Sequence, residues 1–312
     1  MTHKIILDTD IGTDVDDILA LTLALNSPEL DLLAVTTAYG DTRLRAKLTH
    51  QVLTLAGAPP IPVAAGATTS LTGTRPVWWP GHEGRNSRAH EVPDAVISPL
   101  SAVECILETV RAHPDEVTIV ALAPLVNLAQ AIERDPHTMR RVRRIVMMGG
   151  VFGFHDPLRQ LPVAEHNIVC DPGAARVVFD FGLPVDLFPL DVTLGTVLRG
   201  ADVQALGEAG HPLADLLYRE VTDWLEFFRT QLGRNHTQLH DPLTVASLID
   251  PQLITQSFQA GLKIECQGEH TTGMTVTDHQ RSHVRIVQAI DLPRFYELFS
   301  HRVIQVYRQV PA

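Results

Sequence analysis

Short runs of Val, Ile and Leu alternate along the chain with longer stretches in which apolar residues recur every three or four positions. A short, uninterrupted apolar run is typical of a strand buried on both faces of a sheet. The longer stretches have the length and spacing of amphipathic helices. The expected strands are Lys4 to Leu7, Leu30 to Thr37, Pro62 to Ala65, Val117 to Leu122, Arg144 to Met148 and Val185 to Leu190. The expected helices are Ile18 to Leu25, Leu44 to Ala56, Ala102 to His113, Val126 to Glu133 and Pro172 to Phe181.

This alternation predicts an α/β fold, with an open, mostly parallel, Rossmann-like sheet flanked by helices. From Ala201 to about Asp250 the pattern becomes helical. This predicts a helical insertion near the active site, in which residues of approximately 201-240 form a helical cap. Alternating positions in Gly261 to Cys266 and Gly273 to Thr277 predict a hairpin, and a last helix is expected from Pro293. Because no linker and no internal repeat divides the chain, a single domain over residues 1-312 is the simplest organisation.

Length and composition describe an ordinary globular chain. Its 312 residues are 45% apolar and 20% charged, which excludes disordered and fibrous classes. No stretch approaches the roughly eighteen consecutive apolar residues that cross a bilayer, and no small-residue cleavage site follows the first apolar run. We therefore expect a protein that does not cross a membrane and that is cytoplasmic.

Net charge and cysteine content exclude further classes of binding partner and of structural site. The 36 acidic residues outnumber the 25 basic ones, and the net charge of -11 would be repelled by nucleic acid and by anionic membranes. Cys105, Cys170 and Cys266 are widely spaced and form no CxxC pair, which argues against a disulfide framework and a zinc cluster. A neutral or cationic small molecule is the expected substrate, unless a metal intervenes.

The densest chemical signal comes directly after the first expected strand. Five carboxylates lie within ten residues: Asp8, Asp10, Asp14, Asp16 and Asp17. Capping of the following helix and its dipole account for one or two acids, and the others would repel one another unless a cation held them. Because hard cations prefer carboxylate oxygens, the sequence predicts a metal site in this loop.

Two other segments carry candidate chemistry. In the segment His240-Asp241-Pro242, a titratable imidazole adjoins a carboxylate just before an expected helix. Proline in the first helical turn makes Asp241 a natural cap, but this does not account for His240. Glu165 and Asn167 follow a Gly149-Gly150 turn, and two residues spaced in this way point to the same side of an extended segment. Such a pair suits the hydroxyl groups of a sugar.

Together these segments resemble one family, the inosine-uridine preferring nucleoside hydrolases. Its hallmark is a first strand that ends in an aspartate-rich loop and is paired with a distant His-Asp-Pro, here His240-Asp241-Pro242. The intermediate matches, in order, are Thr36-Thr37-Ala38-Tyr39-Gly40-Asp41, Ala123-Pro124-Leu125-Val126-Asn127, Met148-Gly149-Gly150 and Ala164-Glu165-His166-Asn167. The resemblance runs almost end to end, and five ordered matches make chance a poor explanation.

The resemblance implies hydrolysis of the N-glycosidic bond of ribonucleosides, with a calcium ion that holds the ribose hydroxyls and the attacking water. Carried over residue by residue, Asp10 is the general base and a metal ligand. Asp17, Asp241 and the backbone carbonyl of Leu122 are the other ligands, although the family usually has threonine where this chain has Leu122. The chemistry agrees, because an oxocarbenium-like ribosyl group needs negative charge nearby, an activated water and a proton for the departing base.

The same resemblance assigns the substrate contacts. Asp16, Glu165 and Asn167 would bind ribose hydroxyls, and His240 would protonate the departing base, a role suited to an imidazole near neutral pH. His82, in the segment Gly81-His82-Glu83-Gly84, resembles a further base-side histidine, although a solvated loop residue is an equal alternative. The resemblance also implies nucleoside salvage and a homodimer or homotetramer.

The chain departs from the family pattern at several positions. Its acidic loop is two residues longer than the family's short form, which leaves open whether Asp14 or Asp16 contacts ribose, with Asp16 ranked first. Asp41 stands where the family commonly has asparagine, and Arg159 replaces another asparagine. A base-side tyrosine of the family is represented by Phe227-Phe228, with His236 nearby. Sugar contacts and the choice between purine and pyrimidine are therefore open.

Two competing functions use the same residues differently. A phosphohydrolase would employ Asp8 as a nucleophile with magnesium, but the lysine and hydroxyl residues that it needs after later strands do not stand out. A non-catalytic nucleoside or sugar binding protein would keep the metal without turnover. The departures at Asp41 and Arg159 favour the binding protein, whereas the presence of both Asp10 and His240 favours the hydrolase.

Overall fold

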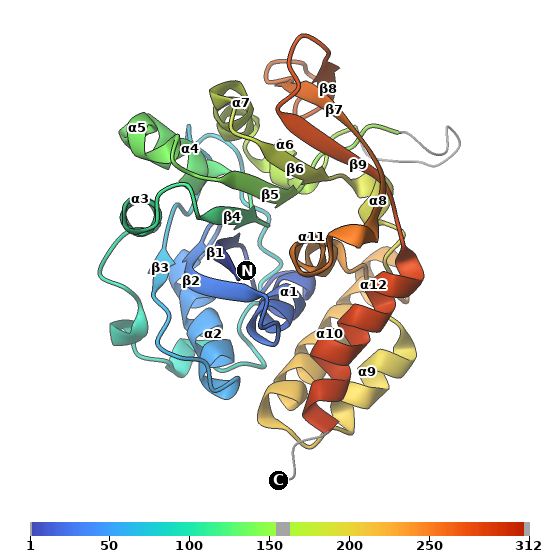
Figure 1. The fold of residues 1–312 in the computed structure, drawn as a ribbon. Helices are drawn as coiled ribbons and strands as arrows, with labels where there is room; N and C mark the ends of the chain where they lie inside the picture. The colour runs from blue at the N-terminus through green and yellow to red at the C-terminus, as the bar shows by residue number, and fades with distance from the viewer. Residues whose placement is uncertain (1, 154–162, 309–312) are drawn as a thin grey trace.

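The computed structural model describes residues 2–153 and 163–308 (Figure 1). Its strands within these residues form one sheet in the order β3-β2-β1-β4-β5-β6-β9-β7-β8. The strands are β1 His3–Thr9, β2 Leu30–Thr37, β3 Val63–Ala65, β4 Thr118–Ala121, β5 Arg144–Met148, β6 Val185–Phe188, β7 Ile254–Ile264, β8 Thr275–Asp278 and β9 Val284–Ile290. In the described sheet the neighbouring strands from β3 through β9 in this order run parallel, whereas β7 pairs antiparallel with both β9 and β8. The predicted α/β class with a mostly parallel sheet is confirmed.

Helices connect the parallel strands and flank the sheet (Figure 1). The α-helices in the described chain are α1 Asp16–Leu25, α2 Thr42–Leu55, α3 Ala102–Ala112, α4 Val126–Arg134, α5 Pro136–Met139, α6 His166–Cys170, α7 Pro172–Phe181, α8 Leu190–Thr193, α9 Gly200–Gly207, α10 Pro212–Leu232, α11 His240–Ile249 and α12 Leu292–Phe299. Several begin at a side-chain cap, as in α3, where Ser101 and Glu104 form a reciprocal capping box. The predicted helices after Ala201 correspond to α9, α10 and α11.

Alternate residues of each strand enter opposite cores, because side chains of a strand point to its two faces in turn. Ile5 and Leu7 of β1 belong to the core that includes α1, α10 and α11. Ile6 of the same strand belongs to the core that includes α3, α4 and α7. Burial on both faces explains why these strands appear in the sequence as continuous apolar runs.

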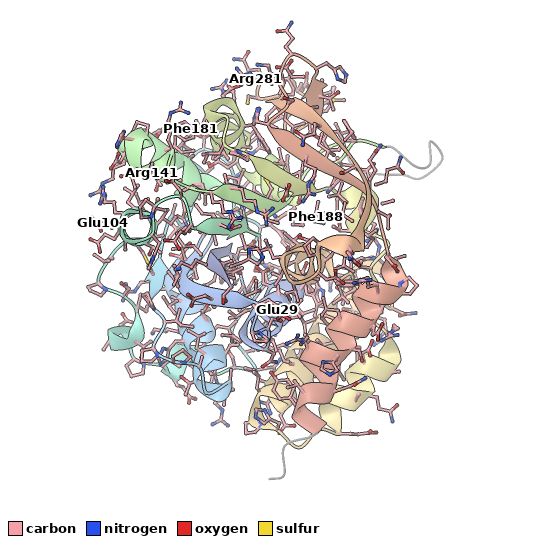
Figure 2. The ribbon with its side chains drawn as sticks, in the orientation of Figure 1. Glu29, Glu104, Arg141, Phe181, Phe188 and Arg281 are labelled. Carbon is pink, nitrogen blue, oxygen red and sulfur yellow. The ribbon has the colours of Figure 1, made fainter. Side chains whose placement is uncertain are left out.

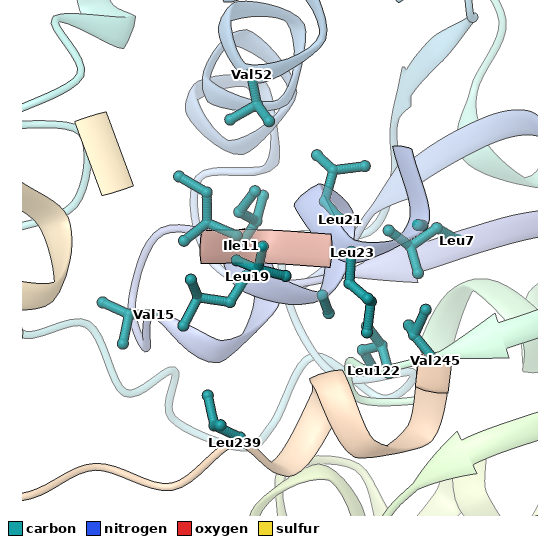
Figure 3. Packing of buried hydrophobic residues seen from close by; sticks show 14 of the residues in the cluster. Leu7, Ile11, Val15, Leu19, Leu21, Leu23, Val52, Leu122, Leu239 and Val245 are labelled. Atoms are coloured by element: carbon teal, nitrogen blue, oxygen red, sulfur yellow. The ribbon is translucent and has the colours of Figure 1, made fainter. Parts of the chain in front are cut away.

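Helices α1 and α11 pack against each other, although more than two hundred residues separate them in the chain. Figure 3 shows Leu19 and Leu23 of α1 in the same buried cluster as Leu122, Leu239 and Val245. Each of these five side chains is no more than 2% exposed. Burying a leucine or valine side chain stabilises a fold by roughly 1.5–3 kcal/mol. This packing therefore holds α1 and α11 in a fixed position relative to each other.

The C-terminal segment contains the predicted hairpin and one strand that the sequence analysis does not predict. β7 and β8 pair antiparallel, with Leu262 opposite Thr277, and α12 begins at Leu292, so the expected hairpin and last helix are confirmed. The additional strand, β9, lies between β6 and β7 and pairs parallel with β6. Its place in the sheet is decided by a pairing across about a hundred residues of chain, which local pattern does not reveal.

Charged side chains lie at the surface and large apolar side chains lie inside (Figure 2). Glu104, Arg141 and Arg281 lie at the periphery, whereas Phe188 at the end of β6 is fully buried. Within residues 2–153 and 163–308, a search for a helix with the length and hydropathy of a membrane span finds none.

Candidate active site

One cavity lies beyond the carboxyl ends of the parallel strands, where open α/β sheets bind their ligands. Its volume is about 450 Å³, which falls in the range of small-molecule sites. The loops after β1, β2, β3, β4 and β5 contribute to it, together with α1, α6, α8, α10 and α11. The lining residues are Asp10, Thr13, Asp14, Asp16, Asp17, Tyr39, Trp78, Leu122, Met148, Ala164, Glu165, His166, Asn167, Val169, Leu190, Trp224, Phe228, His240 and Asp241.

Three carboxylates from opposite ends of the chain meet on one wall of this cavity. Asp16 and Asp17 open α1, Asp241 lies in the first turn of α11, and one oxygen of each lies within 4.8 Å of the others. The backbone N–H of Asp241 donates to Oδ2 of Asp16 at 3.3 Å, and the Thr9 hydroxyl donates to Asp17. The packing of α1 against α11 therefore assembles this carboxylate cluster.

The electrostatics of the cluster fit a divalent cation. Burial, reinforced by the neighbouring carboxylates, holds the pKa values of Asp16, Asp17 and Asp241 well above the ordinary range for aspartate. Like charges this close disfavour ionisation, and a hard cation with oxygen ligands removes that penalty. The donor set, which is all carboxylate, matches calcium or magnesium better than zinc.

The other residues expected at the metal also line the cavity. Asp10 directly follows β1, is half-buried, and its negative charge contributes to the raised pKa of Asp17. The carbonyl oxygen of Leu122 accepts a hydrogen bond of 2.8 Å from Nδ2 of Asn167. Asp14 accepts from the backbone N–H of Val15 at 2.5 Å, and burial raises its pKa to about 7. The structure therefore brings all four expected ligands to one cavity, with Asp16 beside Asp17 and Asp241.

Glu165 and Asn167 also line the cavity, at the start of α6. The Glu165 carboxylate caps this helix, accepting from the backbone N–H groups of Asn167 at 2.8 Å and Ile168 at 3.2 Å, and it also accepts from Gly150 at 3.1 Å. Burial raises the pKa of Glu165 to about 7. Nδ2 of Asn167 donates to the carbonyls of Leu122 and Met148. These bonds fix both side chains against the ends of β4 and β5.

His240 lines the cavity next to Asp241. Its Nδ1 lies 2.7 Å from the Thr193 hydroxyl in α8, which orients the ring. Burial lowers the pKa of His240 to about 4, so the imidazole is neutral at pH 7. The role predicted for His240 suits an imidazole near neutral pH, but burial makes this ring a weaker base in the protein without substrate.

Aromatic side chains border the cavity on a further side. Trp78 is 46% exposed, and its ring centroid lies 5.9 Å from that of His166 and 6.5 Å from that of Trp224. Trp224 is held by a hydrogen bond of 3.0 Å from Nε1 to the Thr237 hydroxyl. Phe228 completes this side one helical turn beyond Trp224. Flat aromatic rings beside the carboxylates of this cavity are suited to stacking against a nucleobase.

Several residues considered in the sequence analysis do not line this cavity. Asp41 is exposed and caps α2 by accepting from Leu44 N at 3.0 Å. His82 lies beside the cavity, with its Nε2 2.8 Å from the Thr13 carbonyl and its ring 5.5 Å from that of Trp224. His236 is exposed, and Arg159 lies outside the described residues.

Asp8, the nucleophile of the phosphohydrolase alternative, is fully buried beneath the cavity and does not line it. Oδ1 of Asp8 accepts from the Thr36 hydroxyl at 2.5 Å and from Nδ2 of Asn127 at 2.8 Å. Burial raises the pKa of this carboxyl to about 7. A carboxyl group without access to substrate does not act as a nucleophile, so the geometry does not support that alternative.

Trp78, Tyr39 and Trp224 line the cavity but are not among the site residues predicted from the sequence. Trp78 appears in a loop without periodicity, and the pattern of α10 makes Trp224 look like an ordinary core residue. A signal for Tyr39 was present, since it lies in the polar segment that follows β2. Tyr39 has a φ of 65°, which is rare for a residue other than glycine, and such backbone strain is frequent at functional sites.

A second, small cavity behind the acidic loop is bordered by a buried carboxyl group, that of Glu220. It is lined by His82, Glu220 and Trp224 among others, and Oε1 of Glu220 has no hydrogen-bond partner among the described residues. Burial, with Asp223 nearby, raises the pKa of Glu220 to about 7. The folded protein thus holds this proton more tightly than the unfolded chain, so Glu220 contributes stability below pH about 4 that is lost as pH rises through about 7.

We therefore expect the Glu220→Gln variant to be more stable than wild-type protein at pH 8, by on the order of 2 kcal/mol in the free energy of unfolding. At pH 4 to 5 the two should differ little. The measurement is urea unfolding between pH 4.5 and 8 with calcium present. Glu226→Gln, an exposed position on the same helix, is the matched control and should show no such gain. Equal pH dependence of wild type and Glu220→Gln would contradict the prediction.

The known proteins that this chain resembles are nucleoside hydrolases. A family model described as inosine-uridine preferring nucleoside hydrolase matches residues 5–297. The pyrimidine-specific ribonucleoside hydrolase RihA of Citrobacter koseri is 34% identical over 315 residues, which cover 97% of this chain and 98% of that protein.

Solved structures agree in fold. A plant nucleoside hydrolase, the PpNRh1 enzyme, superimposes with a TM-score of 0.86 at 29% identity, covering 97% of this chain and 99% of that chain. A purine-preferring ribonucleoside hydrolase from Gardnerella vaginalis gives a TM-score of 0.80 at 25% identity, covering 98% of this chain and 100% of that chain.

Proposed function

This chain belongs to the inosine-uridine preferring nucleoside hydrolase family, and on that premise we propose that it hydrolyses the N-glycosidic bond of ribonucleosides to ribose and free base. The observation that carries the proposal is the meeting of Asp16 and Asp17 with Asp241 in a cavity that also contains His240 and an aromatic border. The hydrolysis needs negative charge near the sugar and a proton for the base, and this cavity offers groups for both.

The resident cation that we propose is calcium. Asp10, Asp17, Asp241 and the carbonyl of Leu122 would hold it, and Asp16 lies close enough to Asp17 and Asp241 to contact either the cation or the ribose beside it. When bound, the cation supplies positive charge for the ribose hydroxyls and the attacking water. Several clustered carboxylates favour calcium over magnesium, because calcium is the larger ion and has the higher coordination number.

Asp10 is the group that we assign as general base. Its side chain is half-buried directly after β1 and lines the cavity, so a water molecule in the cavity can reach it. A carboxylate there takes a proton from water as the oxygen approaches the anomeric carbon of ribose. Glu165 and Asn167, which are fixed against β4 and β5, would orient the sugar through its hydroxyl groups.

His240 stands on the base side of the proposed site. Its imidazole is neutral at pH 7 because burial lowers its pKa to about 4. A neutral imidazole donates a hydrogen bond through one ring nitrogen, and negative charge that develops on the departing base strengthens this bond. Trp78 and Phe228 would contact the faces of the base.

We further propose that pyrimidine ribonucleosides are the preferred substrates. The relative named as pyrimidine-specific is 34% identical to this chain, whereas the purine-preferring solved structure is 25% identical. The aromatic border formed by Trp78, Trp224 and Phe228 accommodates either kind of base by stacking, so the preference rests on the relatives. A homodimer or homotetramer, a cytoplasmic location and a role in nucleoside salvage belong to the same proposal.

The experiment that tests the function measures ribose released from inosine, adenosine, guanosine, uridine and cytidine by wild-type protein. We expect release from all active nucleosides to depend on calcium, with kcat/KM for uridine and cytidine above that for the purine nucleosides by at least the roughly tenfold that 1.4 kcal/mol provides. In parallel, titration of metal-free protein with calcium should show one cation per chain. No ribose from any nucleoside, with calcium bound, would contradict the hydrolase and leave a binding protein.

A further inference from the structure

Arg45 is a buried cation directly behind the acidic loop. It lies in the first half of α2 and is 1% exposed. Its Nε donates to the carbonyl of Tyr39 at 2.6 Å, and Nη1 donates to the carbonyls of Ile11 at 2.8 Å and of Asp10. Burial of a guanidinium is costly unless its donors are satisfied. Arg45 meets this requirement through backbone acceptors and does not rely on a carboxylate partner.

These acceptors belong to the loop that carries the proposed metal site. Residues 10–15 form neither helix nor strand between β1 and α1, so the regular hydrogen bonds of a sheet or helix do not satisfy their backbone groups. Buried carbonyls need a partner, and Arg45 provides one for both Asp10 and Ile11. The peptide groups on both sides of Ile11 are therefore held directly after the proposed general base.

The same guanidinium reaches the segment that borders the base side. Nη2 donates to the Thr13 hydroxyl at 3.0 Å, and that hydroxyl in turn donates to Oε1 of Glu83 at 3.1 Å. The guanidinium carbon lies 4.9 Å from the centre of the Trp79 ring. Arg45 thus connects the acidic loop, the Tyr39 turn and the segment around Trp78 at a single point.

We propose that Arg45 is a positioning residue that holds the acidic loop in its cation-binding shape and attaches it to the Trp79 and Glu83 segment. The inference rests on the proposed metal site. Its two physical effects oppose each other: the positive charge of Arg45 repels a cation, whereas its planar fork fixes the ligand loop. A positioning role means that the second effect is the larger one, because a loop that is already ordered loses less conformational entropy when the cation binds.

Two substitutions separate these effects. Arg45→Lys keeps the charge but loses the planar fork, and Arg45→Met loses both. The measurement is a calorimetric titration of metal-free protein with calcium. If Arg45 positions the loop, both variants should bind calcium roughly 10- to 100-fold more weakly, as expected when a group that supports metal ligands is removed. Arg43→Met, two residues away on α2, is the matched control, because Arg43 is exposed and pairs with Asp94 at 2.7 Å; it should bind calcium like wild-type protein.

A purely electrostatic role gives the opposite pattern, with wild-type affinity in Arg45→Lys and tighter calcium binding in Arg45→Met, and would overturn the inference. Thermal unfolding of the metal-free proteins is followed in parallel, since a merely structural role lowers the unfolding temperature without changing the calcium affinity of folded protein. That result would also overturn it.

If neither Arg45 variant folds, Thr13→Val decides the question, because it removes the acceptor of Nη2 and the link to Glu83 while Arg45 stays in place. Weaker calcium binding supports the inference, and unchanged binding contradicts it. Wild-type protein that binds no calcium would instead contradict the proposed metal site, which distinguishes that failure from a failure of Arg45 alone.

Discussion

The Asp10→Asn variant should release ribose from nucleosides roughly 10²- to 10⁴-fold more slowly than wild-type protein, the range expected for loss of a general base. The amide has the size of the carboxylate and still offers an oxygen to a cation, but it does not accept a proton from water. Asp10 lines the cavity and adjoins the Asp16, Asp17 and Asp241 cluster, so its charge also contributes to cation binding. The measurement is kcat under saturating nucleoside and saturating calcium.

Saturating calcium separates the two roles of Asp10, because any weakened cation binding is then overcome and the remaining loss in kcat reports the base. Asp31→Asn is the matched control: Asp31 is an exposed aspartate on β2 that does not line the cavity. An Asp10→Asn variant whose kcat stays within about tenfold of wild type, less than the smallest effect expected for a general base, would show that another group activates the water.

The His240→Ala variant should lose roughly 10²- to 10⁴-fold in kcat on natural nucleosides but much less on 4-nitrophenyl riboside. A nucleobase departs readily only if it is protonated or strongly hydrogen-bonded, whereas 4-nitrophenolate departs without a proton. The Thr193 hydroxyl fixes the ring of His240 at 2.7 Å, so the remaining ring nitrogen is the one available to substrate. The measurement compares the two substrate types on the same variant.

The exposed His236, which lies between α10 and α11 and outside the cavity, provides the control, and His236→Ala should behave as wild type on both substrates. Equal losses of His240→Ala on nucleosides and on 4-nitrophenyl riboside would contradict a leaving-group role. Because burial lowers the pKa of His240 to about 4, we also expect no loss of activity attributable to this residue as pH rises from 6 to 8.

The fold was largely predictable because its strands are buried on both faces. Continuous apolar runs such as Leu30–Thr37 and Arg144–Met148 coincide with β2 and β5 as observed, and their alternation with amphipathic helices implies a parallel sheet. Strand β9 was the exception. Its buried and half-buried positions follow no regular alternation along Val284–Ile290, and only its pairing between β6 and β7 makes it part of the sheet.

Within the candidate site, residue types and order pointed to the right segments but not to their geometry. The acidic loop, His240-Asp241 and Glu165 to Asn167 all line one cavity. Asp41 lies in a segment that matches the family, yet its exposed side chain caps α2. The sequence did not separate the two roles, because an aspartate after a strand can either cap a helix or contact a substrate. Asp16, expected at the sugar, has an oxygen within 4.8 Å of the carboxylates of Asp17 and Asp241.

By itself, the sequence determined the α/β class, the family and the chemical groups gathered at the strand ends, since these depend on local periodicity and on residue types in order. The tertiary structure alone decided which groups meet. Packing of α1 on α11 brings Asp241 to Asp16 and Asp17, burial makes His240 neutral, and Arg45, which looks like a solvated arginine of an amphipathic helix, lies buried against the loop. Contacts and dielectric surroundings between segments distant in the chain produce these properties, and no local pattern encodes them.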